Sequence, residues 1–158
     1  MQEDFTFLKL AIVQAQKSVT QGGFPAGAVV VKDGEVVSEG VSLGFIQHDP
    51  SSHAETAAVR AACAKLHTAD LTGITLYESI ESCTMCFSVA YWAGIARIVF
   101  AVRKTPEMIK KQYYEGMTDL TKINQENNRQ IELVFLADLE KESLEIVNNW
   151  EKAGGFNQ

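Results

Sequence analysis

The sequence predicts an α/β fold, built as a three-layer α/β/α sandwich around a mixed five-stranded sheet. Short apolar runs of strand length alternate with segments of helical periodicity along all 158 residues. No linker, internal repeat or low-complexity run interrupts this alternation. We therefore expect a single domain over residues 1–158, long enough to bury a substantial core.

The first predicted elements are a helix and a β-hairpin. Apolar residues recur at helical spacing from Asp4 to about Val19, and Gly22-Gly23 ends this helix because glycine readily adopts a left-handed C-cap. A buried strand over Gly27–Val31 and a return strand over Val36–Val41 flank Asp33-Gly34, which is typical of a tight hairpin turn.

The middle of the chain predicts two helices separated by a strand. Pro50 and the serines after it indicate a helix start at His53, and the alanine-rich run to Leu66 supports that helix. A strand over Ile74–Tyr77 follows, and the next predicted helix covers Cys83–Trp92.

The last third of the chain continues the alternation. The expected elements are a strand, a short helix, a strand and a final helix, at Ile98–Val102, Glu107–Tyr114, Ile131–Leu136 and Leu139–Trp150. Together with the earlier strands, they supply five strands for one sheet with helices on its faces.

The composition is that of an ordinary soluble domain, with 46% hydrophobic and 22% charged residues. No stretch approaches the roughly 20 apolar residues of a membrane helix, so no membrane partner is expected. The acidic segment Met1–Asp4 lacks the basic region of a secretory signal. Of three cysteines, two belong to a single CxxC and only Cys63 remains, so we expect no disulfide framework and a cytoplasmic location.

The charge balance argues against a nucleic-acid partner. Lys and Arg number 14 against 20 Asp and Glu, giving a net charge of −6, whereas affinity for phosphates depends on cationic contacts. A small basic cluster interrupts this pattern at Arg103, Lys104, Lys110 and Lys111. A solvated helix face explains this cluster at least as well as a nucleic-acid site.

The chemistry of the chain is concentrated in His53-Ala54-Glu55 and Cys83-Thr84-Met85-Cys86. One imidazole and two thiolates form a nitrogen and sulfur donor set that suits Zn²⁺. The two cysteines, three residues apart on a predicted helix, share one helix face. Three protein ligands leave one coordination position open, where water can be activated, and Glu55 is placed to move that water's protons. The pattern predicts a metal-dependent hydrolytic site.

Each part of this pattern also has another interpretation. A CxxC alone is found in dithiol redox proteins. Ser52-His53-Ala54-Glu55 fits a capping box, and Glu55 as a fourth ligand would make the zinc site purely structural. The combination of His-x-Glu with a downstream CxxC favours catalysis over these alternatives. Tyr91-Trp92 fits core packing at a helix end, with substrate stacking by Trp92 as the alternative.

The chain resembles the zinc-dependent cytidine deaminase superfamily, whose pattern is His-x-Glu followed by Pro-Cys-x-x-Cys. Most of the chain takes part in the resemblance, through Phe24–Val29, His48–Glu55 and Leu76–Cys86. It is closest to the guanine deaminase and tRNA adenosine deaminase branch, and Tyr91-Trp92-Ala93 is similar to guanine deaminases.

The resemblance implies a hydrolytic deaminase of a free nucleobase or a related amino-heterocycle, with a guanine-like purine favoured. It implies that His53, Cys83 and Cys86 hold Zn²⁺, and that Glu55 carries protons from water to the ring nitrogen and the leaving ammonia. It also implies that the backbone N–H of Cys83 stabilises the tetrahedral centre.

The resemblance further suggests four substrate contacts, which are Ser42, Ala54, Trp92 and Glu115. It implies a homodimer as well, whose subunit contact near the active site Trp150 and Phe156 are expected to close. The alternatives are a tRNA adenosine deaminase and a non-catalytic zinc-binding interaction protein.

Two residues depart from the family pattern. Ser82 stands where the family has proline before the first cysteine, and we expect serine to cap the following helix and zinc binding to persist. Ser42 stands eleven residues before His53, where the guanine and tRNA branch has asparagine. Because serine offers one hydroxyl in place of an amide, we expect guanine to be a poor substrate.

Overall fold

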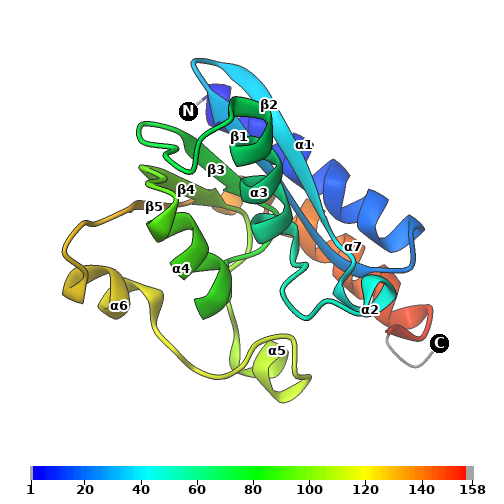
Figure 1. The fold of residues 1–158 in the computed structure, drawn as a ribbon. Coiled ribbons are helices and arrows are strands. Elements are labelled where there is room, and N and C mark those ends of the chain that lie inside the picture. Colours follow the sequence, from blue (N-terminus) through cyan, green and yellow to red (C-terminus); the bar gives the residue numbers. More distant parts are fainter. Residues whose placement is uncertain (1, 156–158) are drawn as a thin grey trace.

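The computed structural model describes residues 2–155 and contains one mixed sheet in the order β2-β1-β3-β4-β5 (Figure 1). The strands, in chain order, are β1 Phe24–Lys32, β2 Glu35–Ser42, β3 Thr75–Glu78, β4 Arg97–Phe100 and β5 Glu132–Phe135. β1 runs antiparallel to both β2 and β3, whereas β3, β4 and β5 are parallel. The predicted α/β fold around a mixed five-stranded sheet is confirmed.

Four long helices cover the two faces of this sheet. Helices α1 (Gln2–Thr20) and α7 (Glu140–Lys152) pack together on one face, and α3 (Ala54–Leu66) and α4 (Thr84–Trp92) pack together on the other (Figure 1). Their bounds differ from the predicted ones by a few residues at most. None of the helices in the described part of the chain is long and apolar enough to cross a bilayer.

Strand β3 divides its side chains between the two faces because successive strand residues point to opposite sides. Tyr77 packs on Phe7 of α1, with ring centroids 5.4 Å apart, and its hydroxyl donates to Asp4 Oδ1 at 3.0 Å. Arg97 donates to both oxygens of Asp4, which lowers the pKa of Asp4 to about 2. Glu78, the next residue, is therefore directed to the α3 and α4 face.

Three short helices lie in the connections, namely α2 (Gly44–Gln47), α5 (Pro106–Lys110) and α6 (Leu120–Glu126). The helix expected over Glu107–Tyr114 ends early, because Gln112 takes a left-handed conformation with φ of 62°. Helices α2 and α6 are too short to give a periodic signal in the sequence.

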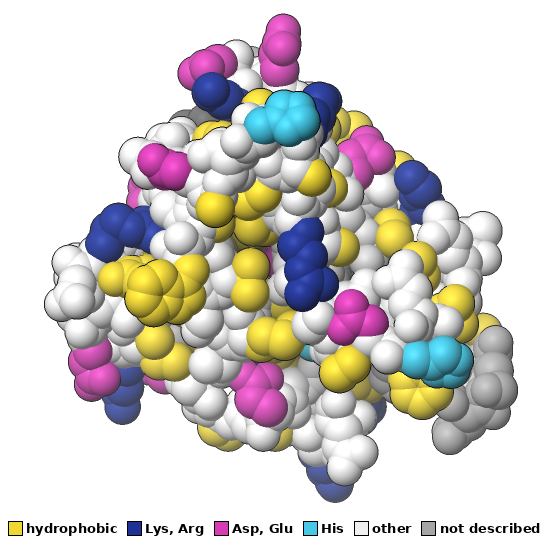
Figure 2. Space-filling model, viewed as in Figure 1, with side chains coloured by type: hydrophobic (Ala, Val, Ile, Leu, Met, Phe, Trp, Pro, Cys, Tyr) yellow, Lys and Arg dark blue, Asp and Glu magenta, His cyan; other side chains and the backbone are white. Residues whose placement is uncertain are grey.

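The surface carries charges of both signs. In Figure 2 the basic and acidic side chains on this face are scattered singly among hydrophobic and neutral ones, and the basic ones form no continuous stripe.

Candidate metal centre and active-site pocket

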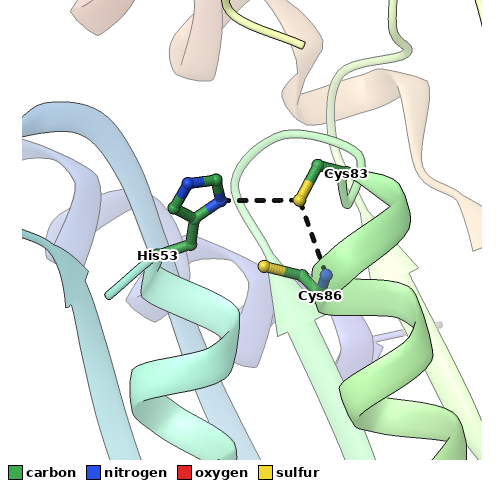
Figure 3. A group of neighbouring side chains, drawn as sticks. All are labelled: His53, Cys83 and Cys86. Carbon is green, nitrogen blue, oxygen red and sulfur yellow. Dashed lines mark hydrogen bonds between the residues drawn. The ribbon is translucent and has the colours of Figure 1, made fainter. Parts of the chain in front are cut away.

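His53, Cys83 and Cys86 meet in the layer between α3 and α4 (Figure 3). Their ligand atoms all lie within 4.8 Å of one another, and His53 Nδ1 is 3.5 Å from Cys83 Sγ. The side chains come from the starts of the two helices and point into a common space. The sequence prediction that these three residues form one cluster therefore agrees with the geometry.

Both helices present their N-terminal ends to this cluster. His53 is the N-cap of α3 and Cys83 the N-cap of α4, each with extended backbone, so the positive ends of two helix dipoles face the cluster. The hydrogen bond from Cys86 and the contact with His53 lower the pKa of Cys83 to about 5, although burial opposes this. The lowered pKa favours the thiolate form of Cys83, which is the form that binds metal.

The donor set fits Zn²⁺. A hydrogen bond with the Cys83 sulfur, followed by burial, raises the pKa of Cys86, and repulsion by the negative charges of Glu55 and Cys83 adds to this. A divalent ion removes that repulsion, and an imidazole with two thiolates is a soft set with room for one further ligand.

Glu55 lies beside the cluster without belonging to it. Its Oε2 is 3.6 Å from Cys86 Sγ, and its side chain is 5% exposed. Burial, followed by the charge of Cys83, raises the pKa of Glu55 to about 7. The capping-box interpretation is wrong, because His53 is the N-cap and makes no side-chain cap, while the Ser52 hydroxyl donates to Gln47.

The turn before Cys83 departs from the expectation for Ser82. The predicted cap by Ser82 is wrong, because the N-cap is Cys83, whose sulfur accepts a hydrogen bond from the Cys86 N–H. Ser82 is instead bonded through its N–H and its hydroxyl to the carboxyl of Glu78.

A cavity of about 940 Å³ opens over Glu55 and the metal ligands. Its apolar lining includes Phe24, Ala26, Phe45, Ile80, Ile109, Tyr113 and Tyr114, and its polar lining includes Ser42, His48, Asp49, Glu81, Gln112 and Glu115. An apolar pocket with a few polar groups and a perturbed carboxyl at its floor has the character of a small-molecule site.

Two of the four expected substrate contacts, Ser42 and Glu115, line this cavity. The backbone of Ser42 is fixed by Ser18, and its hydroxyl has no hydrogen-bond partner among residues 2–155. Glu115 Oε1 accepts from the Thr84 N–H at 2.7 Å. Burial raises the pKa of Glu115, but the hydrogen bonds from Thr84 and from its own backbone, together with the charge of Lys104, outweigh burial and lower the net pKa, which favours the carboxylate.

The other two expected contacts are not brought to the cavity lining. Trp92 is 83% exposed on α4, against the ring of Tyr91, so it is neither a core residue nor part of the pocket wall. Ala54 is fully buried between His53 and Glu55.

One aromatic wall of the cavity was missed by the sequence interpretation. Phe24 and Tyr113 pack edge-to-face with centroids 5.2 Å apart, and Trp150 of α7 contacts both rings at 5.3 and 5.8 Å. The Tyr113 hydroxyl donates to Glu151 at 2.7 Å. Trp150, which was expected near a subunit contact, is only 8% exposed and packs within its own chain. Phe156, expected beside it, lies outside the described residues.

Comparison with known proteins identifies the family. Residues 1–102 match the model of the cytidine and deoxycytidylate deaminase zinc-binding region. The chain belongs to this family. Its cofactor is Zn²⁺, and His53, Cys83 and Cys86 are the candidate site for it.

Relatives of this zinc-binding deaminase chain include two kinds of enzyme. The chain is 42% identical to the guanine deaminase of Bacillus subtilis (strain 168) over 101 residues. This aligned stretch covers 63% of this chain and 65% of that protein. The chain is 36% identical to the tRNA-specific adenosine deaminase of Aquifex aeolicus (strain VF5) over 95 residues. This stretch covers 60% of this chain and 63% of that protein. These matches span less than two thirds of each relative.

Solved structures extend the likeness over more of the chain. The guanine deaminase of Bacillus subtilis is 33% identical with a TM-score of 0.64, over 93% of this chain and 92% of that one. A structure from a study of A-to-I editing by tRNA:A34 deaminases is 28% identical with a TM-score of 0.77, over 90% and 99%.

Proposed function

We propose that this protein is a zinc-dependent hydrolytic deaminase of a free nucleobase or a related amino-substituted heterocycle. The observation that carries this proposal is the position of Glu55, a buried carboxyl beside a three-ligand metal centre on the floor of a pocket. Deamination is the activity for which these relatives are named, and the free base as substrate is the finer part of the proposal.

His53, Cys83 and Cys86 would hold Zn²⁺, which when bound acts as a Lewis acid and lowers the pKa of water. Glu55 accepts one proton from the attacking water and passes it to the ring nitrogen. The oxygen bonds to the ring carbon, the bond from that carbon to the exocyclic nitrogen breaks, and Glu55 transfers the water's second proton to the departing ammonia. A buried carboxyl whose pKa is near neutrality suits both directions of transfer.

The start of α4 supplies the remaining polar groups of the proposed site. The N–H groups of Thr84 and Cys86 are already bound, to Glu115 and to Cys83 Sγ. The backbone N–H of Cys83, the N-cap of α4, is the proposed donor to the oxygen that gains charge in the tetrahedral centre.

Three features favour a free base over a tRNA. The cavity wall is aromatic on one side and carries the carboxylate of Glu115, which suits a heterocycle with N–H donors. The net charge is −6, and the basic side chains in Figure 2 are dispersed, which is unfavourable for binding a phosphate backbone. The likeness to tRNA:A34 deaminase structures keeps tRNA adenosine as the second candidate.

Ammonia release distinguishes these functions. The zinc-loaded protein is assayed with purine and pyrimidine bases, amino-triazines, their nucleosides, and a tRNA carrying adenosine at its wobble position. We expect release with at least one free base or heterocycle. Turnover of the tRNA alone would make the second candidate correct, and no release from any substrate would support a non-catalytic zinc protein.

The proposed enzyme is a homodimer, as sequence resemblance implies. Light scattering of the active protein tests this, and a strict monomer with full activity would contradict it. Because Trp150 is packed against Phe24 and Tyr113, we do not expect its substitution to act mainly through subunit contact.

A further inference from the structure

Glu78 is a buried carboxyl that the proposed reaction does not use. It is the last residue of β3, is 0% exposed, and is directed to the face of the sheet that carries α3, α4 and the metal ligands. A carboxyl is rarely buried completely unless it has hydrogen-bond partners. The partners of Glu78 therefore indicate what it does.

Both partners are in Ser82, the residue just before the ligand Cys83. The Ser82 N–H donates to Glu78 Oε2 at 3.0 Å, and the Ser82 hydroxyl is 2.5 Å from Oε1. Ser82 is itself only 1% exposed. Proline, the family residue at position 82, has no backbone N–H and could not donate to Glu78. Serine at position 82 therefore goes together with a buried acceptor at position 78.

The rest of the turn is anchored by other elements. Ser79 exchanges hydrogen bonds with Gly27 of β1, and its carbonyl accepts from Ser143 of α7 at 2.6 Å. The Glu81 N–H donates to Val102 O at 2.8 Å, and the Glu81 carbonyl accepts from Tyr114. Ser82 is held through Glu78, which makes this carboxyl the anchor of the residue that precedes the metal ligand.

We propose that Glu78 is a positioning residue for the metal centre, which clamps Ser82 and thereby fixes Cys83 Sγ relative to Cys86 and His53. This inference rests on the proposed zinc site. Groups behind the metal ligands orient them, and their loss typically costs about 10–100-fold in metal affinity. Position 82 and position 78 should therefore act as a unit.

Cobalt binding tests the pair without any substrate. Metal-free wild type, Glu78→Val, Glu78→Gln, Ser82→Pro and the double variant Glu78→Val/Ser82→Pro are titrated with Co²⁺. The readouts are the dissociation constant and the thiolate-to-cobalt absorption band. We expect Glu78→Val to weaken binding by about 10–100-fold and to alter the band. Glu78→Gln should keep the wild-type dissociation constant and absorption band, because its amide can accept from the Ser82 N–H and donate to the Ser82 hydroxyl.

The double variant reports whether the two positions cooperate. Ser82→Pro should weaken Co²⁺ binding by about tenfold or more while Glu78 is present, because it leaves a buried acceptor without its donor. In the Glu78→Val background the same proline should cost less than about threefold. Equal losses in both backgrounds would overturn the proposal.

Ile74→Ala is the matched control, since Ile74 is 2% exposed just before the opposite end of β3. It should lower the melting temperature and leave Co²⁺ affinity unchanged. A loss of affinity equal to that of Glu78→Val would mean that Glu78 only supports the fold in general.

If Glu78→Val does not fold, the comparison of Ser82→Ala with Ser82→Pro tests the proposal. Ser82→Ala keeps the N–H and should bind Co²⁺ more tightly than Ser82→Pro, and the reverse order would overturn the clamp. Wild type that binds no Co²⁺ would refute the zinc site itself, whereas tight binding without ammonia release would refute only the proposed reaction.

Discussion

The pKa values of two acids on opposite faces of the sheet are shifted in opposite directions. On the α1 and α7 face, Asp4 is held by Arg97 and Tyr77, and its pKa falls to about 2. On the α3 and α4 face, Glu55 is buried with thiols and no paired cation among the described residues, and its pKa rises to about 7. The same functional group thus stabilises the fold on one face and is available for proton transfer on the other.

The largest expected effect is the fall in kcat when Glu55, the proposed proton carrier, is substituted. Glu55→Gln keeps the shape of the side chain but cannot take a proton, so kcat should fall by about 10²–10⁴-fold. The proposed role makes Glu55 a proton carrier and not a ligand, so metal analysis should still find one zinc per chain. Cys86→Ala is the matched variant and should lose the zinc. If Glu55→Ala loses zinc as completely as Cys86→Ala, Glu55 is a ligand and the role assigned to it fails.

The next effect concerns substrate selectivity, which we expect to depend on Ser42 in the cavity lining. Ser42→Asn should raise kcat/KM for guanine by roughly ten- to a hundred-fold relative to the preferred substrate, because an unpaired polar edge costs about 1–3 kcal/mol. The Ser42 hydroxyl lines the cavity, where an amide would offer paired donor and acceptor groups. The measurement is kcat/KM for both substrates in both proteins. Efficient guanine turnover by wild type, unchanged in the variant, would remove this explanation.

A third prediction tests the ion-paired face. Asp4→Asn should lower the free energy of unfolding at pH 7 by about 1–2 kcal/mol, with the activity of the folded protein unchanged. Because the folded pKa of Asp4 is depressed from 3.8 to about 2, its contribution is present above pH 3.8 and is lost as the pH falls towards 2. Urea unfolding of both proteins across this range should show the difference shrinking. A difference that persists at pH 2 would argue for lost packing.

The smallest effect concerns Trp92, which lies on α4, on the same face of the sheet as Glu55, but outside the pocket. Trp92→Ala should change kcat/KM for a free base by less than about twofold, since surface substitutions away from a site are nearly neutral. Phe45→Ala, which removes an aromatic side chain from the cavity lining, is the comparison variant and should raise KM. A large loss with Trp92→Ala would restore its proposed stacking role.

Local patterns were sufficient to predict most of the fold and the metal centre. Apolar periodicity predicted the long helices, and His-x-Glu together with CxxC predicted the cluster of His53, Cys83 and Cys86, because each of these signals lies within one short segment. The Glu78 and Ser82 pair was missed, since a glutamate at the end of a predicted strand carries no sign of its burial. Trp92 was misjudged for the opposite reason, because an aromatic residue on an apolar helix gives no sign of its exposure.

The pocket wall was beyond prediction because it is made of distant segments. Phe24 and Tyr113 of the cavity lining and Trp150, which packs on both, come from three separate parts of the chain, and only tertiary packing brings their rings together. Phe45 and His48 lie in a connection around a helix of one turn, which gives no periodic signal.

That aromatic wall has a consequence for how this protein can diversify. The metal ligands and Glu55 all lie within residues 1–102, the part matched by the family, while Tyr113, Glu115 and Trp150 come after it. The metal centre is thus encoded within the family-matched stretch, whereas the cavity lining is drawn from both stretches. Mutations in the second stretch can therefore reshape part of the cavity without touching the metal ligands or Glu55.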